Sequence, residues 1–147
     1  MAASAFDDIT YAASRPTTTR APGKAALWTS RILTGIVAVL LAMDAGMKLI
    51  RAKAAVEGSV QLGFAPDQVF VIGVIALVCL VLYLVPRTAP LGAVLWTGYF
   101  GGAVVTHLRV GNPLFTHILS GVYVSTLIWV SLYLRDPRVR ALVGKAR

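Results

Sequence analysis

The sequence contains a single cysteine, Cys79, and only six acidic residues among 147. One cysteine cannot form an internal disulfide, which excludes any mechanism that needs a Cys-x-x-Cys dithiol within this chain. Buried cysteines often behave as small hydrophobic side chains, and Cys79 lies within an apolar run. The sequence also has no phosphate-binding loop, no nucleophile elbow, and no flavin, haem or iron–sulfur motif. Short sequence motifs therefore identify no reaction for this chain.

Apolar residues, by contrast, make up 57% of the chain, and the mean hydropathy is +0.75. Soluble domains average about 45–50% apolar residues. The excess lies in four runs, at residues 27–50, 68–85, 91–107 and 114–134. Each run has about 17 to 24 residues, long enough as a helix to cross a hydrocarbon core roughly 30 Å thick. Strict alternation of apolar and polar residues is absent, so we expect an all-α integral membrane bundle of four transmembrane helices rather than a barrel.

The basic residues indicate how this bundle is oriented. Most of the 14 lysines and arginines flank the ends of the runs that share a side with both termini. The positive-inside rule therefore predicts cytoplasmic N- and C-termini in a multi-pass protein of the inner (plasma) membrane. The net charge of +8 is interpreted as this topology signal, with contact to anionic headgroups of the bilayer, and no nucleic-acid partner is expected. The predicted parts are a disordered cytoplasmic tail (1–26), a transmembrane domain (27–136) and a basic cytoplasmic tail (137–147).

Ionisable side chains gather toward the end of the runs opposite the termini. They are Asp44, Lys48, His107, Arg109 and His117. Asp44 and Lys48 are spaced i,i+4 with the acid first, the orientation that pairs best on a helix. Ionisable groups within or just under a membrane usually have a partner or a function. We therefore expect these residues to form a polar site beneath the outer membrane surface.

Several interpretations of this polar site remain open. Trp96 and Phe100 share a helical stripe with His107, which would allow a quinone ring to stack while the histidine donates to a carbonyl oxygen. Histidine titrates near neutrality, and Arg109 and Lys48 supply positive charge, so a proton or small-anion permeation site is an alternative. The ion pair can also simply close the first helix, and each histidine can be an interfacial side chain. No metal is expected, because these groups lack tight ligand spacing.

A third interpretation is a non-catalytic structural or assembly subunit. Gly98, Gly101 and Gly102 form a small-xxx-small pattern in the third run, which lets helix backbones approach closely. We expect this face to pack against a neighbouring helix.

Several segments together resemble a known family. They are DAGMKL at 44–49, LVPRTAPLGA at 84–93, TGYFGGA at 97–103, HLRVGNPLF at 107–115, and Trp129 ahead of LYLRD at 132–136. This pattern resembles the DoxX-like family of small bacterial four-helix membrane proteins over about residues 27 to 142.

The resemblance implies a redox role. The family's namesake is similar to a subunit of a thiosulfate:quinone oxidoreductase of the respiratory membrane, and other relatives are associated with oxidative-stress systems. The expected protein is a redox-complex subunit with a bound quinone as its cofactor, whereas the permeation alternative would require a homo-oligomer, because four helices make only a thin pore. Lys48, Arg87 and Arg109 are carried over as candidate functional residues. Many DoxX-type proteins have an acidic residue in the second helix, whereas residues 68–85 here contain none.

Overall fold

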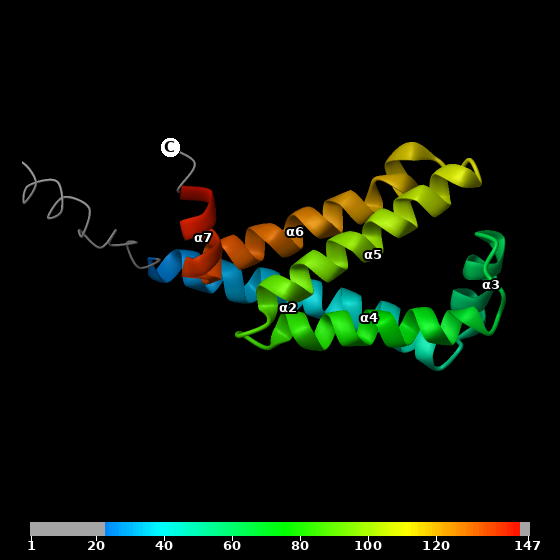
Figure 1. Ribbon diagram of the computed structural model, residues 1–147, viewed down its shortest axis with the longest axis horizontal. Coiled ribbons are helices and arrows are strands. Elements are labelled where there is room, and N and C mark those ends of the chain that lie inside the picture. The colour runs from blue at the N-terminus through cyan, green and yellow to red at the C-terminus, as the bar shows by residue number, and fades with distance from the viewer. Residues whose placement is uncertain (1–22, 145–147) are drawn as a thin grey trace, which may run out of the picture.

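The structure, a computed structural model, describes residues 23–144, and over that range it is all-helical without strands. Four long helices run along the bundle axis (Figure 1): α2 (Lys24–Leu49), α4 (Gln68–Leu84), α5 (Ala89–Arg109) and α6 (Ser120–Arg135). Three short elements complete this range: α3 (Lys53–Gln61), the π-helical turn η1 (Leu114–Ile118) and α7 (Pro137–Gly144). The parts of the predicted tails at 1–22 and 145–147 lie outside the described residues.

The prediction of an all-helical membrane protein is confirmed in its coarse form. Three helical segments, α2, α5 and the run Leu114–Arg135, are long and apolar enough to cross a membrane. The fourth, α4, has 17 residues and therefore spans about 26 Å. It carries no charged residue, which suits a hydrocarbon environment. The fourth crossing and the orientation of the termini stay predictions.

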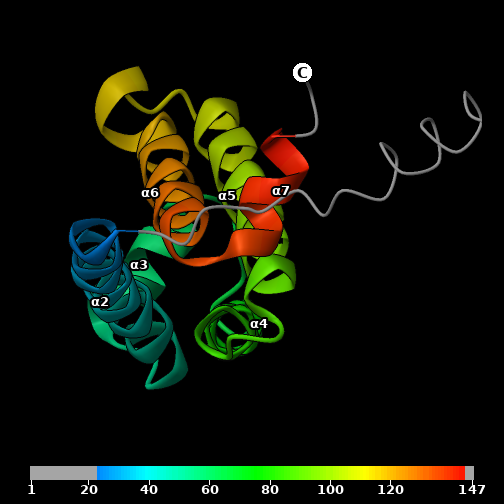
Figure 2. The ribbon, with the colours of Figure 1, turned by 90° about the vertical axis from the view of Figure 1, so that its left-hand side faces the viewer.

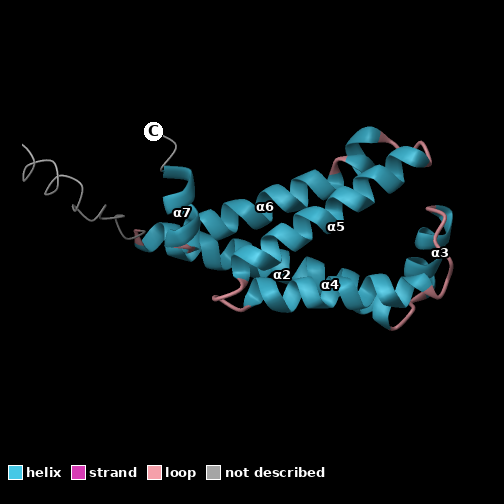
Figure 3. Cartoon of the chain, in the orientation of Figure 1, coloured by secondary structure: helices cyan, strands magenta, loops and turns pink. Residues whose placement is uncertain are grey.

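The four long helices occupy the corners of a square when viewed along the bundle (Figure 2). Each helix packs on two neighbours, in the cyclic order α2, α4, α5, α6. Short loops join the elements (Figure 3), so consecutive long helices are antiparallel. The shared core includes Val37, Ala76, Trp96, Ile128 and Leu132, all fully buried.

The connection between α2 and α4 contains α3, a helix that the apolar pattern did not reveal. Helix α3 ends in a turn in which the N–H of Phe64 donates to the Ser59 carbonyl, and Gly63 adopts φ +89°. This left-handed conformation favours glycine and is typical of a helix C-terminus. Helix α2 ends in the same kind of turn, but with Arg51 at φ +53°. The Arg51 guanidinium bonds the Asp67 carboxylate at 2.7 Å, which holds the start of α4 beside the end of α2.

Close helix approach depends on glycines other than those expected from the sequence. An added Cβ at Gly92 would overlap the backbone of Tyr83 on α4. At Gly73, on α4, it would lie 2.9 Å from the Cβ of Lys48 on α2. A Cβ at Gly121, on α6, would lie 3.2 Å from the Cβ of Phe100 on α5.

The predicted packing glycines of α5 behave differently. An added Cβ at Gly98, Gly101 or Gly102 meets no atom within 4 Å. These glycines therefore do not hold α5 against another helix of the described bundle. At Gly102 the open space belongs to the cavity described below, and packing of these glycines against a different chain stays a prediction.

Candidate functional site

A cavity of about 540 Å³ lies at the end of the bundle that carries α3. There the α5 and α6 pair separates from the α2 and α4 pair (Figure 1). Both pairs, together with α3 and η1, contribute to its lining. Most of this lining is apolar, including Leu40, Leu41, Ile72, Ile75 and Val124. The volume falls within the range of about 300–1,000 Å³ that is usual for small-molecule sites.

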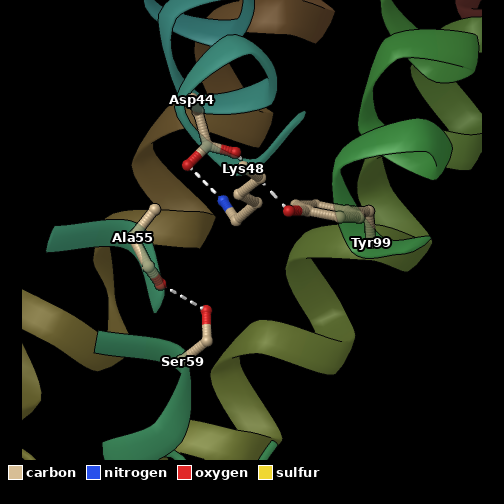
Figure 4. A network of polar contacts seen from close by, with 5 residues as sticks. All are labelled: Asp44, Lys48, Ala55, Ser59 and Tyr99. Carbon is tan, nitrogen blue, oxygen red and sulfur yellow. Dashed lines mark hydrogen bonds and ion pairs between the residues drawn. The ribbon is translucent and has the colours of Figure 1, made fainter. Parts of the chain in front are cut away.

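The polar wall of the cavity is an ion pair with an aromatic partner. Lys48 and Asp44 pair across one turn of α2, and the Tyr99 hydroxyl on α5 donates to Asp44 Oδ2 at 3.5 Å (Figure 4). Lys48 Nζ lies 6.0 Å from the centre of the Tyr99 ring. The Lys48 side chain is 16% exposed and that of Asp44 44%. Burial of the lysine is tolerable because the carboxylate and the ring face both stabilise its charge.

Helix α3 lies beside this polar wall. Ser59 lines the cavity and is itself largely buried, and its hydroxyl donates to the Ala55 carbonyl at 2.7 Å (Figure 4). The short helix therefore covers the cavity with a side chain whose hydrogen bond is already satisfied.

Two further lining residues are histidines that lie together. The rings of His107 on α5 and His117 on η1 have centres 5.7 Å apart. The Asn112 amide nitrogen lies 2.7 Å from His107 Nδ1. An amide nitrogen only donates, so Nδ1 accepts and a neutral His107 carries its proton on Nε2. This leaves His107 Nε2 as a donor for a ligand.

The structure places the residues expected at the site in two groups. Asp44, Lys48, Phe100, His107 and His117 line the cavity, whereas Trp96 and Arg109 do not. Trp96 is fully buried behind the lining, where it stacks on Phe100 with ring centres 5.2 Å apart. Its edge contact with Tyr99 has a centre distance of 5.0 Å. Trp96 therefore supports two lining residues without reaching the cavity.

Arg109 does not line the cavity and instead connects two helices. Its guanidinium donates to the Leu62 carbonyl at 3.0 Å and so links the end of α5 to the end of α3. The absence of a side chain at Gly63 makes room for this contact, because an added Cβ would lie 2.5 Å from Arg109 Nη2. Arg87, which the family resemblance suggested, is exposed in the turn between α4 and α5, away from the cavity.

Tyr99, which contacts the ion pair, is a lining residue that the sequence analysis missed. It stands within the segment that carried the family resemblance, next to the expected Phe100. A tyrosine in the interior of an apolar run needs a hydrogen-bond partner for its hydroxyl. This requirement could have indicated that Tyr99 faces a polar group. Among residues 23–144, no three histidine, cysteine or acidic side chains lie close enough together to hold a metal ion.

Comparison with known proteins gives one match. A model of the DoxX-like family matches residues 32–131, which extend from within α2 to within α6 and include all of the cavity lining. No curated protein and no solved structure matches the chain.

Proposed function

We propose that this chain, which belongs to the DoxX-like family, is a quinone-binding subunit of a redox or oxidative-stress system in the inner membrane. In this proposal all four long helices cross the bilayer and both termini are cytoplasmic, as the distribution of basic residues favours. The cavity then lies on the outer side of the membrane.

The observation that carries the proposal is the composition of the cavity lining. A quinone headgroup is a flat ring with carbonyl oxygens that accept hydrogen bonds, and its tail is apolar. The cavity combines apolar walls and the Phe100 ring with three donors, Lys48, Tyr99 and His107. A mostly apolar pocket with a few convergent polar groups is the usual form of a cofactor site.

Each donor would have a distinct role toward the headgroup. Lys48, already placed by Asp44, would donate one of its remaining hydrogens to one carbonyl oxygen, and Tyr99 would reach the same oxygen by exchanging its bond to Asp44 for one to the quinone. His107 would donate from Nε2 to the other, with its ring orientation fixed by Asn112. When bound, a quinone supplies a reversible acceptor of electrons and protons. The sequence has no flavin, haem or iron–sulfur motif, so the electrons would come from a partner subunit.

The direct test is purification of the full chain in several mild detergents, followed by lipid extraction and mass spectrometry. We expect stoichiometric quinone in the wild-type protein. Ala103→Phe would fill the cavity, and Val105→Phe on the exposed face of the same helix is its matched control. We expect quinone to be lost from Ala103→Phe and retained by Val105→Phe. Quinone-free wild-type protein in every detergent, or equal quinone in both variants, would contradict the proposal.

A titration with a short-chain quinone gives an independent measurement. Trp96 stacks on Phe100, so its fluorescence should be quenched when a quinone enters the cavity. The other two tryptophans do not line the cavity: Trp129 is on α6, and Trp28, 64% exposed at the far end of α2, would respond only to non-specific partitioning. Saturable quenching that persists in Trp28→Phe and disappears in Trp96→Phe is the expected result.

A further inference from the structure

A second cavity, of about 310 Å³, lies at the end of the bundle where α6 meets α7. It is formed between the turn joining α4 to α5 and the corner joining α6 to α7, which crosses the end of the bundle (Figure 2). Its lining residues are Pro86, Ala89, Arg135, Asp136, Pro137 and Arg138. We call this cavity the arginine notch.

Positive charge dominates the arginine notch. Arg135 and Arg138 line it, Arg87 lies in the adjoining turn, and none of the ion pairs formed among residues 23–144 includes any of them. The one acidic residue in the lining, Asp136, accepts the backbone N–H of Arg138 at 2.8 Å. The carboxylate keeps its charge in that contact, but two arginines against one aspartate, with Arg87 nearby, leave the notch with excess positive charge.

Arg135 is held in place before any ligand binds. Its Nη2 donates to the Tyr83 carbonyl at 3.0 Å, and its Cζ lies 4.9 Å from the centre of the Tyr83 ring. Its Nε is buried and has no hydrogen-bond partner among the described residues. A guanidinium with a fixed orientation loses little freedom on binding, and its planar donor geometry suits phosphate oxygens.

The surroundings of the arginine notch are apolar and exposed. Leu84 and Val85, beside the lining residue Pro86, are 45% and 44% exposed. On α7, Val139 packs into the core, whereas Leu142 is 75% exposed. A ligand with a phosphate group and hydrocarbon chains could pair its phosphate with the arginines and cover these exposed apolar side chains. Basic pockets beside transmembrane helices bind anionic lipid headgroups through this kind of charge pairing.

We propose that the arginine notch binds the phosphate of an anionic membrane phospholipid. Its acyl chains would run along the apolar ends of α4 and α5, and its headgroup would hold α7 across the end of the bundle. Free phosphate shares the same oxyanion chemistry, but it would leave the exposed apolar rim uncovered. The site is independent of the quinone cavity, which lies at the other end of the helices.

The test is native mass spectrometry of the full chain in detergent, with added phosphatidylglycerol, phosphatidylcholine or inorganic phosphate. Arg138→Gln removes one exposed guanidinium from the lining, and Arg135→Gln removes the anchored one. Arg31→Gln is the matched control, because Arg31 is also exposed near the same end but does not line the notch. We expect each lining variant to weaken phosphatidylglycerol binding about fivefold.

The control should bind phosphatidylglycerol as the wild type does, and phosphatidylcholine should bind weakly to every variant. Equal loss in Arg31→Gln and Arg138→Gln would overturn the proposal, because it would show a diffuse effect of surface charge. Competition by inorganic phosphate at the same concentration as the lipid would also overturn it in favour of a free anion. Arg138→Gln decides the outcome if Arg135→Gln fails to fold.

Discussion

The contact between α4 and α5 at Gly92 gives a stability prediction whose size follows from the geometry. A Cβ at this position would overlap the Tyr83 backbone nitrogen and would lie 2.6 Å from Tyr83 Cα and 2.8 Å from the Leu82 carbonyl carbon. All three are backbone atoms, so no side-chain rotation can relieve the overlap and the two helices must separate. Overpacking of this kind costs about 1–3 kcal/mol, and we expect Gly92→Ala to reach about 3 kcal/mol.

Gly98→Ala on the same helix is the matched control. An added Cβ at Gly98 meets nothing within 4 Å, so only the helix propensity changes, in favour of alanine by about 1 kcal/mol. Gly92→Ala gains the same propensity, so the two variants should differ by the overpacking cost alone, about 3 kcal/mol in the free energy of unfolding. For a chain of this size, that difference corresponds to roughly 10 °C in Tm.

The chain carries its own reporter for this measurement. Cys79 is the single cysteine and is 4% exposed in the core, so a fluorogenic thiol reagent should react with it only when the bundle opens. Thermal unfolding in detergent with this reagent gives Tm without further substitution. A Tm for Gly92→Ala at or above the wild-type value would refute the reasoning. A lower Tm for Gly98→Ala would instead show that its open face contacts another chain.

The remaining stability predictions use the same thiol assay. Lys48→Met and Asp44→Leu should each cost about 2 kcal/mol, because each leaves a half-buried charge without its partner, and the double variant should recover most of that loss. Additive losses in the double variant would show that the ion pair contributes no coupling. Gly63→Ala should cost about 1–2 kcal/mol, because alanine is strained at φ +89° and its Cβ would crowd Arg109. It should also speed hydrogen exchange over residues 59–66, whereas Gly58→Ala, which meets open space, should not.

Length and hydropathy were sufficient to locate the long helices, because a membrane-spanning run is a local property of the sequence. Helix α3 was not found in this way. Its residues are mixed in polarity, and its position depends on the turn at Gly63 and on the contact that Arg109 makes with the Leu62 carbonyl. Every residue has a backbone carbonyl, so the residue that accepts such a bond can be of any type. No sequence pattern could therefore reveal this contact.

The candidate site also has a part that was predictable from the sequence and a part that was not. The pairing of Asp44 with Lys48 follows from their spacing on one helix and was predictable. The choice between Trp96 and Tyr99 as the aromatic residue facing the ion pair depends on how α5 is rotated against α2. That rotation is fixed by contacts between helices distant in sequence. Trp96 and His107 do share one stripe of α5, as predicted. In the bundle, however, only His107 of the two lines the cavity.

The positions of the close glycine contacts explain why the cavity opens at only one end. At the level of the cavity, Gly73 brings α4 against Lys48 on α2, and Gly121 brings α6 against Phe100 on α5. These contacts hold each pair of helices together internally. The glycine contact that joins one pair to the other is at Gly92, near the opposite end.

With the pairs joined at Gly92, they diverge toward α3, and side-chain contacts bridge them there. The Tyr99 hydroxyl reaches Asp44, and the Arg109 guanidinium reaches the Leu62 carbonyl. Both bridges are single hydrogen bonds, which are weak compared with backbone packing. At the opposite end the pairs are also joined by hydrogen bonds from Ser30 and Arg135, so a bound ligand can alter the opening most easily by replacing one of the two bridges beside the cavity.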